Sequence, residues 1–291
     1  MESSVDVVVS SDGFPISDGI FYYRAQDRGW ILVDVRSDEA GLRYAAIAGD
    51  TKVFPTSRSG FWRSATVRVY KEYPVSFEIY GHTAFFLNPE SAGTGAMSYD
   101  VPPYSASKGI LERFAGVRSK EGVFFHPESV EVCFRPSFRK LSFNYNGAFR
   151  KMDLINEGRA HVQTFQALVD PVYVIRGKVL RLPYFMDWTG TTNAVHKYCD
   201  EIMDRCKKGT GNAMPCIGVG DCMAWNYCLP RKDTHPNEHF NKHLSQIRFS
   251  PYDRPINGRN VCSYMRNVEI KKGVMKYVWS YPELPVEGSE W

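Results

Sequence analysis

The sequence predicts an α+β fold, because strand patterns and helix patterns follow one another through residues 73–222. In the first strand of this stretch Val75, Phe77 and Ile79 occupy alternate positions, which is the period of a half-buried strand. After Ser105 the apolar residues recur at the wider spacing of a helix that buries one face. The two periods together indicate a mixed domain rather than an all-helical or all-strand protein.

The first helix is expected over residues 105–114. Ser105 is the residue type that caps a helix N-terminus, since its hydroxyl accepts a bond from a free backbone N–H. Ile110, Leu111 and Phe114 then share the apolar face.

The second helix is expected over residues 193–208, with Asn193 as its N-cap. Its apolar face would consist of Val195, Ile202, Met203 and Cys206. The stretch ends with Lys207, Lys208 and Gly209, which suits a helix C-terminus, because cations interact favourably with the helix dipole there and glycine accepts a left-handed conformation.

Strand patterns rich in β-branched or aromatic residues occupy 122–135 and 171–182, and a glycine-rich loop leads into a short strand before Cys222. The order strand, helix, strand, strand, helix, strand is that of a ferredoxin-like or RRM-like domain. Further strands are expected on both sides of this domain, at 29–35, 42–48, 51–55, 246–249, 263–270 and 274–279. We therefore expect a small β-rich N-terminal extension over residues 1–72, the ferredoxin-like domain over 73–222 and a β-rich C-terminal appendage over 223–291.

The composition excludes several classes of protein. The 291 residues are 43% hydrophobic and carry a net charge of +4, which suits a folded and mildly basic protein. No apolar run approaches the ~20 residues that span a bilayer, so no membrane partner is expected. Seven cysteines are an odd number, and the N-terminus has no signal-peptide pattern, so we expect reduced thiols and a cytoplasmic protein.

Four segments carry a resemblance to a known family, and they are Val75–Glu90, Met97–Phe114, Asp170–Leu182 and Asn193–Cys222. The most specific is MSYDVPPYSASKGILERF, at Met97–Phe114. Together these segments resemble the CRISPR-associated "Cas five" family of subtype I-C over roughly three quarters of the chain. Residues 1–72 lie outside the resemblance.

The resemblance implies a function in antiviral defence. Members of this family bind the 5′ handle of CRISPR RNA (crRNA), cut the precursor crRNA without a metal or other cofactor, and nucleate the Cascade complex. The implied partners are crRNA and precursor crRNA, the backbone and large Cascade subunits, and target DNA through the complex. By this resemblance the RNA-binding candidates include Tyr104, Lys108, Lys207 and Lys208.

Cutting in this family uses a tyrosine and a lysine–histidine pair, which act on the ribose 2′-OH and the scissile phosphate. The matching positions in this sequence are Phe124 (or Ala115, if the insertion is placed otherwise), Lys197 and Tyr198. Two of the three reactive groups are thus replaced.

Two histidines lie close in sequence to the replaced groups, His126 near Phe124 and His196 beside Lys197. Imidazole titrates near neutral pH and can act as an acid or a base. The catalytic candidates are therefore Lys197, Tyr198, His126 and His196. The alternative is that both histidines are surface residues, and on a helix His196 points about 100° away from Lys197.

Three hypotheses about function follow. The protein is a metal-independent endoribonuclease with a rearranged site, or it is a non-catalytic scaffold that holds the handle. In the third hypothesis a mobile element encodes it as a copy that enters a host Cascade and inhibits it.

A basic and aromatic segment adds further RNA-binding candidates. Arg135, Arg139 and Lys140 surround Phe138, within a long connection between the second and third strands. Cations and exposed rings are the groups that bind single-stranded RNA. The segment is expected to contact RNA or a partner subunit, and the alternative is a solvated loop.

A group of cysteines and histidines, Cys216, Cys222, Cys228, His235, His239 and His243, resembles a zinc set only loosely. The cysteine spacing is not that of a zinc finger, so buried thiols and exposed histidines are expected, with no metal site. Near the N-terminus Arg58, Arg63 and Arg68 surround Phe61 and Trp62, either as a nucleic-acid contact or as solvated residues of an edge strand.

Overall fold

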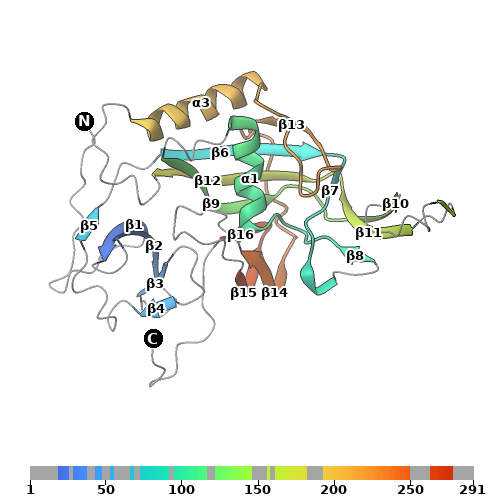
Figure 1. The fold of residues 1–291 in the computed structure, drawn as a ribbon, viewed down its shortest axis with the longest axis horizontal. Helices are drawn as coiled ribbons and strands as arrows, with labels where there is room; N and C mark the ends of the chain where they lie inside the picture. The colour runs from blue at the N-terminus through green and yellow to red at the C-terminus, as the bar shows by residue number, and fades with distance from the viewer. Residues whose placement is uncertain are drawn as a thin grey trace.

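The chain folds into a mixed α and β protein that consists mostly of strands, with two α-helices of more than ten residues in its described part (Figure 1). The structure is a computed structural model. It describes residues 19–25, 29–37, 43–47, 53–55, 66–68, 73–91, 95–116, 122–145, 156–157, 161–181, 193–249 and 263–277.

A seven-stranded antiparallel sheet forms the centre of the protein, in the order β13-β6-β12-β9-β16-β15-β14. Its strands are β6 (Tyr73–Gly81), β9 (Val123–Val132), β12 (Val172–Arg181), β13 (Ala224–Cys228), β14 (Lys242–Phe249), β15 (Ser263–Lys271) and β16 (Val274–Lys276).

The half of this sheet made by β13, β6, β12 and β9 contains the four strands that alternate with helices along the chain. Their order along the chain is β6, β9, β12, β13. In the sheet they lie in the order β13, β6, β12, β9, so the fourth strand is followed by the first, the third and the second. The fourth strand begins at Ala224, just after the expected stretch, which ends at Cys222. The expected strands after it join the same sheet, because β16 pairs with β9.

Helix α1 spans Tyr104–Ala115 and buries Ile110, Leu111 and Phe114 as predicted. The prediction that Ser105 caps it was wrong. The residue before the helix is Pro103, and no side chain caps the N-terminus. Proline has its φ preset near the helical value and lacks an N–H, so it opens a helix without a capping hydroxyl.

Helix α3 spans Ala194–Lys208, and both of its predicted ends are confirmed. The Asn193 side chain accepts a hydrogen bond from the backbone N–H of His196 at 3.1 Å. Gly209 ends the helix in the left-handed conformation, with φ of 63°. The two helices contact each other, because the Arg205 guanidinium donates to the carbonyl of Phe114.

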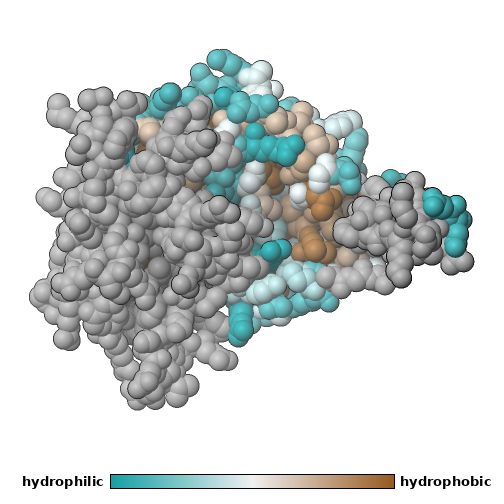
Figure 2. Space-filling view, in the orientation of Figure 1, coloured by the Kyte–Doolittle hydropathy of each residue, from teal (hydrophilic) through white to brown (hydrophobic). Residues whose placement is uncertain are grey.

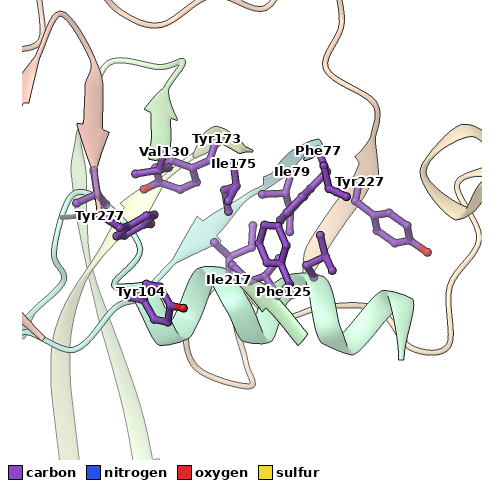
Figure 3. Packing of buried hydrophobic residues seen from close by; sticks show 14 of the residues in the cluster. Phe77, Ile79, Tyr104, Phe125, Val130, Tyr173, Ile175, Ile217, Tyr227 and Tyr277 are labelled. Atoms are coloured by element: carbon purple, nitrogen blue, oxygen red, sulfur yellow. The ribbon is translucent and has the colours of Figure 1, made fainter. Parts of the chain in front are cut away.

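The main core lies between the helices and the sheet, and Figure 3 shows part of it. The ring of Phe77 on β6 packs edge-on against Phe114 of α1 and Phe125 of β9. Val75 and Ile79 are buried beside it, as the alternation predicts. Glu78 on the opposite face of β6 is also buried, so this strand is covered on both faces.

The long connection between the second and third strands is a β-hairpin rather than a loop. Strand β10 (Phe138–Tyr145) pairs along its length with β11 (His161–Val169). Strand β11 also pairs with β7 (Thr83–Ala84) and β8 (Ala96–Met97). The hairpin extends beyond the end of the central sheet (Figure 1).

The N-terminal region contains a second sheet of five strands, in the order β4-β3-β2-β1-β5. The three expected strands correspond to β2 (Gly29–Ser37), β3 (Arg43–Ile47) and β4 (Val53–Pro55), whereas β1 (Gly19–Ala25) and β5 (Thr66–Arg68) were not predicted. Arg68 belongs to β5, whereas Arg58 and Arg63 lie outside the described residues. Among the described helices none has the length and apolarity needed to cross a membrane.

Candidate nucleic-acid interface

The segment Met97–Phe114, which carries most of the resemblance, is tied into the core by polar contacts. Ser98 accepts a hydrogen bond from the Phe86 N–H at 2.9 Å. The buried Asp100 carboxylate pairs with Lys242, and its backbone carbonyl accepts from the Tyr173 hydroxyl at 2.7 Å. These contacts hold the N-terminus of α1 against the sheet.

Tyr104, a predicted RNA contact, is buried at the first turn of α1. Its hydroxyl lies 2.7 Å from Nδ1 of His126, which is itself buried on β9. The alternative interpretation of His126 as a surface histidine was wrong, because its ring is buried against Tyr104 of α1. The Tyr104 ring in turn packs at a right angle against Tyr277, whose hydroxyl lies 2.6 Å from that of Ser107. In this conformation neither Tyr104 nor His126 reaches solvent.

Lys108, the second predicted RNA contact in this segment, is buried as well. Its ammonium group pairs with the Glu112 carboxylate one helical turn away, at 3.0 Å, and lies 5.8 Å from the centre of the Phe124 ring. Phe124 occupies one of the two positions matched to the family's tyrosine, and it is buried too. Lys108 and Phe124 therefore pack inside the protein and not at its surface.

Of the candidates on α3, Tyr198 is buried and its hydroxyl donates to the carbonyl of Gly116 at 2.8 Å. Tyr198 is thus adjacent to Ala115, the alternative position for the family's tyrosine. His196 and Lys197 are exposed, and the His196 imidazole lies 3.2 Å from the Asp200 carboxylate.

The four catalytic candidates do not share one location. His126 contacts Tyr104 at the N-terminal end of α1, whereas Tyr198 contacts Gly116 at its C-terminal end. The helix between these two contacts is about 18 Å long, at 1.5 Å per residue. An acid and a base that act on one phosphodiester must both lie within hydrogen-bond reach of it, whereas the buried His126 and Tyr198 are each held by a different partner.

The predicted RNA contacts at the end of α3 are accessible. Lys207 and Lys208 are exposed on the last turn, and residues 209–214 form an exposed loop. Figure 2 shows hydrophilic residues over α3. The loop closes over the C-terminus of α1, since the Asn212 N–H donates to the Phe114 carbonyl at 2.9 Å.

Two arginines that the sequence analysis did not single out lie beside this loop. Arg113 on α1 is exposed and donates through Nε to the carbonyl of Met214. Arg205 on α3 donates to the Phe114 carbonyl at 2.9 Å and to the Asn212 side chain at 3.0 Å. Their positions depend on contacts between segments about 100 residues apart, which no local sequence pattern reveals.

The remaining predicted cations, Arg135, Arg139 and Lys140, are exposed at the base of the β10–β11 hairpin. Phe138 and Leu141 on the same strand are half-buried and pack on apolar clusters of the core. The apolar residues therefore anchor the hairpin and leave the cations in solvent.

The sheet face that carries Glu78 holds ion pairs rather than aromatic rings. Arg176 pairs with Glu131, Lys178 pairs with Glu128, and Arg231 pairs with the buried Glu78 through Nε and Nη2. Because each cation has a carboxylate beside it, this face attracts phosphates weakly.

The cysteines and histidines considered as a zinc set do not form one within the described residues, where no group of three potential ligands occurs. Residues 235–243 contain no helix, so the three histidines do not share a helical face. Burial raises the pKa of the Cys206 thiol to about 12, with a smaller effect of Cys228. Burial also raises the pKa of Cys222.

Comparisons with known proteins concern the fold alone. Neither the protein-family profiles nor the curated proteins include a match. The structure is similar to a crystal structure described as a CRISPR-associated protein, with a TM-score of 0.52 and 16% identity over 70% of this chain and 91% of that chain. It is also similar to a functionally uncharacterized protein, SMU1763c, from Streptococcus mutans, with a TM-score of 0.50 and 14% identity over 70% of this chain and 92% of that chain.

Proposed function

We propose that this protein is a subunit of a type I-C CRISPR effector complex (Cascade) that holds the 5′ handle of crRNA without cutting it. Its partners are crRNA and the other subunits of the complex. Precursor crRNA would then be cut by another protein.

One observation carries the proposal, the contrast in accessibility between two sets of residues. The exposed set consists of five of the seven RNA-binding candidates, all of them cations able to bind phosphates: Arg135, Arg139, Lys140, Lys207 and Lys208. The other two candidates, Tyr104 and Lys108, are buried. The buried set contains Tyr198 and His126, two of the four groups expected to cut. Binding needs only the exposed cations, whereas cutting needs reactive groups gathered at one phosphate.

The fold supports the same proposal. The strand order fourth, first, third, second is the order of a ferredoxin-like domain, which RRM-like RNA-binding proteins share. A fold can host many functions, so this supports the assignment less than the accessible cations do. The solved structure described as a CRISPR-associated protein has a similar fold over 91% of its length.

A second candidate function is metal-independent cleavage at the start of α3. The observation that favours it is that His196 and Lys197 are both exposed there, with Asp200 beside the imidazole. A carboxylate next to a histidine orients the ring. In this candidate function His196 is the single histidine that takes part in cleavage, together with Lys197.

The experiment that separates the two functions uses the purified protein, EDTA and the repeat RNA from the CRISPR array nearest its gene. We expect the protein to bind the RNA and leave it intact at every pH between about 6 and 9. Because this range includes the ordinary pKa of imidazole, cleavage that depends on a histidine would appear at some pH within it. RNA cut at a single position, with loss of cutting in His196→Ala, would instead establish the second function. No binding of the repeat RNA would overturn both.

A further inference from the structure

Strands β14 and β15 form a basic two-stranded ribbon at one edge of the central sheet. The ribbon and the turn residue after it, Lys242–Phe249 and Ser263–Lys272, carry five lysines and arginines, of which Lys242 pairs with Asp100 and Lys271 pairs with Glu269. No predicted RNA-binding residue lies on this ribbon.

The ribbon has one buried face and one exposed face. Leu244 pairs with Val268 and Ile247 pairs with Met265, and all four side chains are buried in the core. The cross-strand pairs on either side of Ile247–Met265, Arg248 with Tyr264 and Gln246 with Arg266, therefore point to the other face.

Tyr264 is the exposed aromatic residue of this face, with 39% of its surface accessible. Arg248 lies directly across from it on β14, and Arg266 follows two positions later on β15. Residues two apart in a strand are separated by about 6.6 Å. A ring with a guanidinium on two sides can stack on one base while the cations contact the neighbouring phosphates.

A buried tyrosine lies close to this pair of residues. Tyr99 is 3% exposed, and its hydroxyl has no hydrogen-bond partner among the described residues. Burial raises the pKa of Tyr99 to about 12, and the nearby charges of Glu90, Tyr264 and Arg248 also affect it. The phenol thus stays protonated at neutral pH and lies close to the Tyr264–Arg248 pair.

The ribbon is also linked to the β10–β11 hairpin. Glu90, in the short helix η2 (Pro89–Ser91), accepts a hydrogen bond from Gln246 of β14 at 2.8 Å. The chain then continues into β8, which pairs with β11 of the hairpin. The segment from Glu90 to β8 therefore connects two surfaces that both expose cations.

We propose that the outer face of the β14–β15 ribbon is a second contact surface for single-stranded RNA. Tyr264 stacks on one unpaired base, and Arg248 and Arg266 bind the phosphates on either side. This rests on the proposed function, because the same RNA would continue from the hairpin to the ribbon. The exposed guanidinium of Arg266, beside Arg248 and the exposed ring of Tyr264, favours a polyanion over a protein partner.

The test measures the affinity of the full-length protein for the repeat RNA over a series of salt concentrations, in EDTA. Tyr264→Ala is expected to weaken binding by about 5- to 150-fold with an unchanged salt slope, because stacking releases no counterions. Arg266→Ala is expected to reduce the slope by about 0.7, the value for one phosphate of a single strand. Tyr264→Phe keeps the ring and should bind like the wild type.

The matched control is Lys271→Ala, which removes one positive charge from the same strand about 20 Å from Tyr264. Lys271 pairs with Glu269, so its loss should change the affinity less than twofold. A DNA strand of the same sequence tests whether the site requires RNA, and binding equal to that of RNA would overturn the RNA assignment.

The outcomes distinguish the two proposals. Wild-type affinity in both Tyr264→Ala and Arg266→Ala, with weakened binding in Arg139→Ala/Lys140→Ala, overturns the ribbon site and leaves the proposed function intact. Absence of RNA binding by the wild-type protein overturns both. A thermal melt checks that Tyr264→Ala is folded, and ultraviolet cross-linking of the wild type to RNA should label the peptide that contains Tyr264.

Discussion

At the scale of single residues, burial separates side chains that stabilise the fold from side chains that are accessible to a ligand. Tyr104, His126 and Tyr198 carry reactive side chains, and each is buried with a hydrogen-bond partner from another element. Sequence can identify such residues by type, but it cannot show that a segment distant in the chain covers them.

Tyr198→Phe tests whether the Tyr198 hydroxyl is structural. The variant loses the hydrogen bond to the Gly116 carbonyl and leaves that acceptor without its donor, so the free energy of unfolding should fall by about 1–2 kcal/mol. Urea denaturation measures this change, and RNA affinity should stay within twofold of the wild type. Unchanged stability with altered RNA processing would contradict the structural role.

A second residue-scale prediction concerns the buried Glu78. Arg231→Ala removes the guanidinium that pairs with it and should lower the free energy of unfolding by about 2–4 kcal/mol, because a buried carboxylate then lacks its counter-charge. Glu78→Gln/Arg231→Ala removes the charge as well and should be more stable than Arg231→Ala alone. The reverse order in denaturation experiments would contradict this account.

The buried thiols predict a loss of stability at high pH. Burial raises the pKa of Cys206 to about 12, and burial followed by the charge of Glu131 raises that of Cys133 to about 12, against 9.0 without the fold. Above about pH 9 the unfolded chain releases these protons while the folded protein keeps them, so the free energy of unfolding falls as pH rises from 9 to 12. Urea denaturation between pH 8 and 10.5 should show a shallower decline for Cys206→Ala than for the wild type. An equal decline would exclude this thiol as a cause.

At the scale of elements, the sequence predicted what local patterns determine. The Asn193 cap and the Gly209 end of α3 depend on neighbouring residues and are confirmed. Of its predicted apolar face, Val195, Ile202 and Cys206 are buried, whereas Met203 is only half-buried. The β10–β11 hairpin was missed because Phe138–Tyr145 contains polar residues on both faces, and it forms a strand through pairing with β11, about 20 residues later. Likewise, the burial of Glu78 on β6 requires Arg231, which is 153 residues away.

Substitution by alanine is expected to have opposite effects on stability at two glycines, one in the loop after α3 and one in α1. Gly211→Ala places a Cβ 2.3 Å from the Tyr227 hydroxyl and 2.8 Å from the Phe114 carbonyl, so it should destabilise the protein by about 1–3 kcal/mol and displace the loop after Lys208. Gly109 is exposed inside α1 with nothing within 4 Å, so Gly109→Ala should stabilise by about 0.5–1 kcal/mol. Thermal melts of both variants check these signs. Gly220→Ala, which also has open space around it, is the control for the loop.

At the scale of the whole molecule, the β-rich C-terminal region is continuous with the central domain. β16 pairs with β9, so β14 and β15 extend the same sheet that α1 and α3 cover in part. The sequence predicted these strands but not the sheet they join, because strand pairing between distant segments leaves no local pattern. The exposed cations consequently lie on three parts of one body, the hairpin, the end of α3 and the ribbon.

The measurement that tests the central claim most directly is the salt dependence of repeat-RNA binding by the wild type and by Arg135→Ala/Arg139→Ala/Lys140→Ala. The wild type should bind with a steep slope, and the triple variant should show weaker binding with a slope reduced by about 2, since each lost phosphate contact changes it by about 0.7. Melting temperatures of the two proteins should agree, because all three side chains are exposed. Identical affinity and slope for the two proteins would contradict the account.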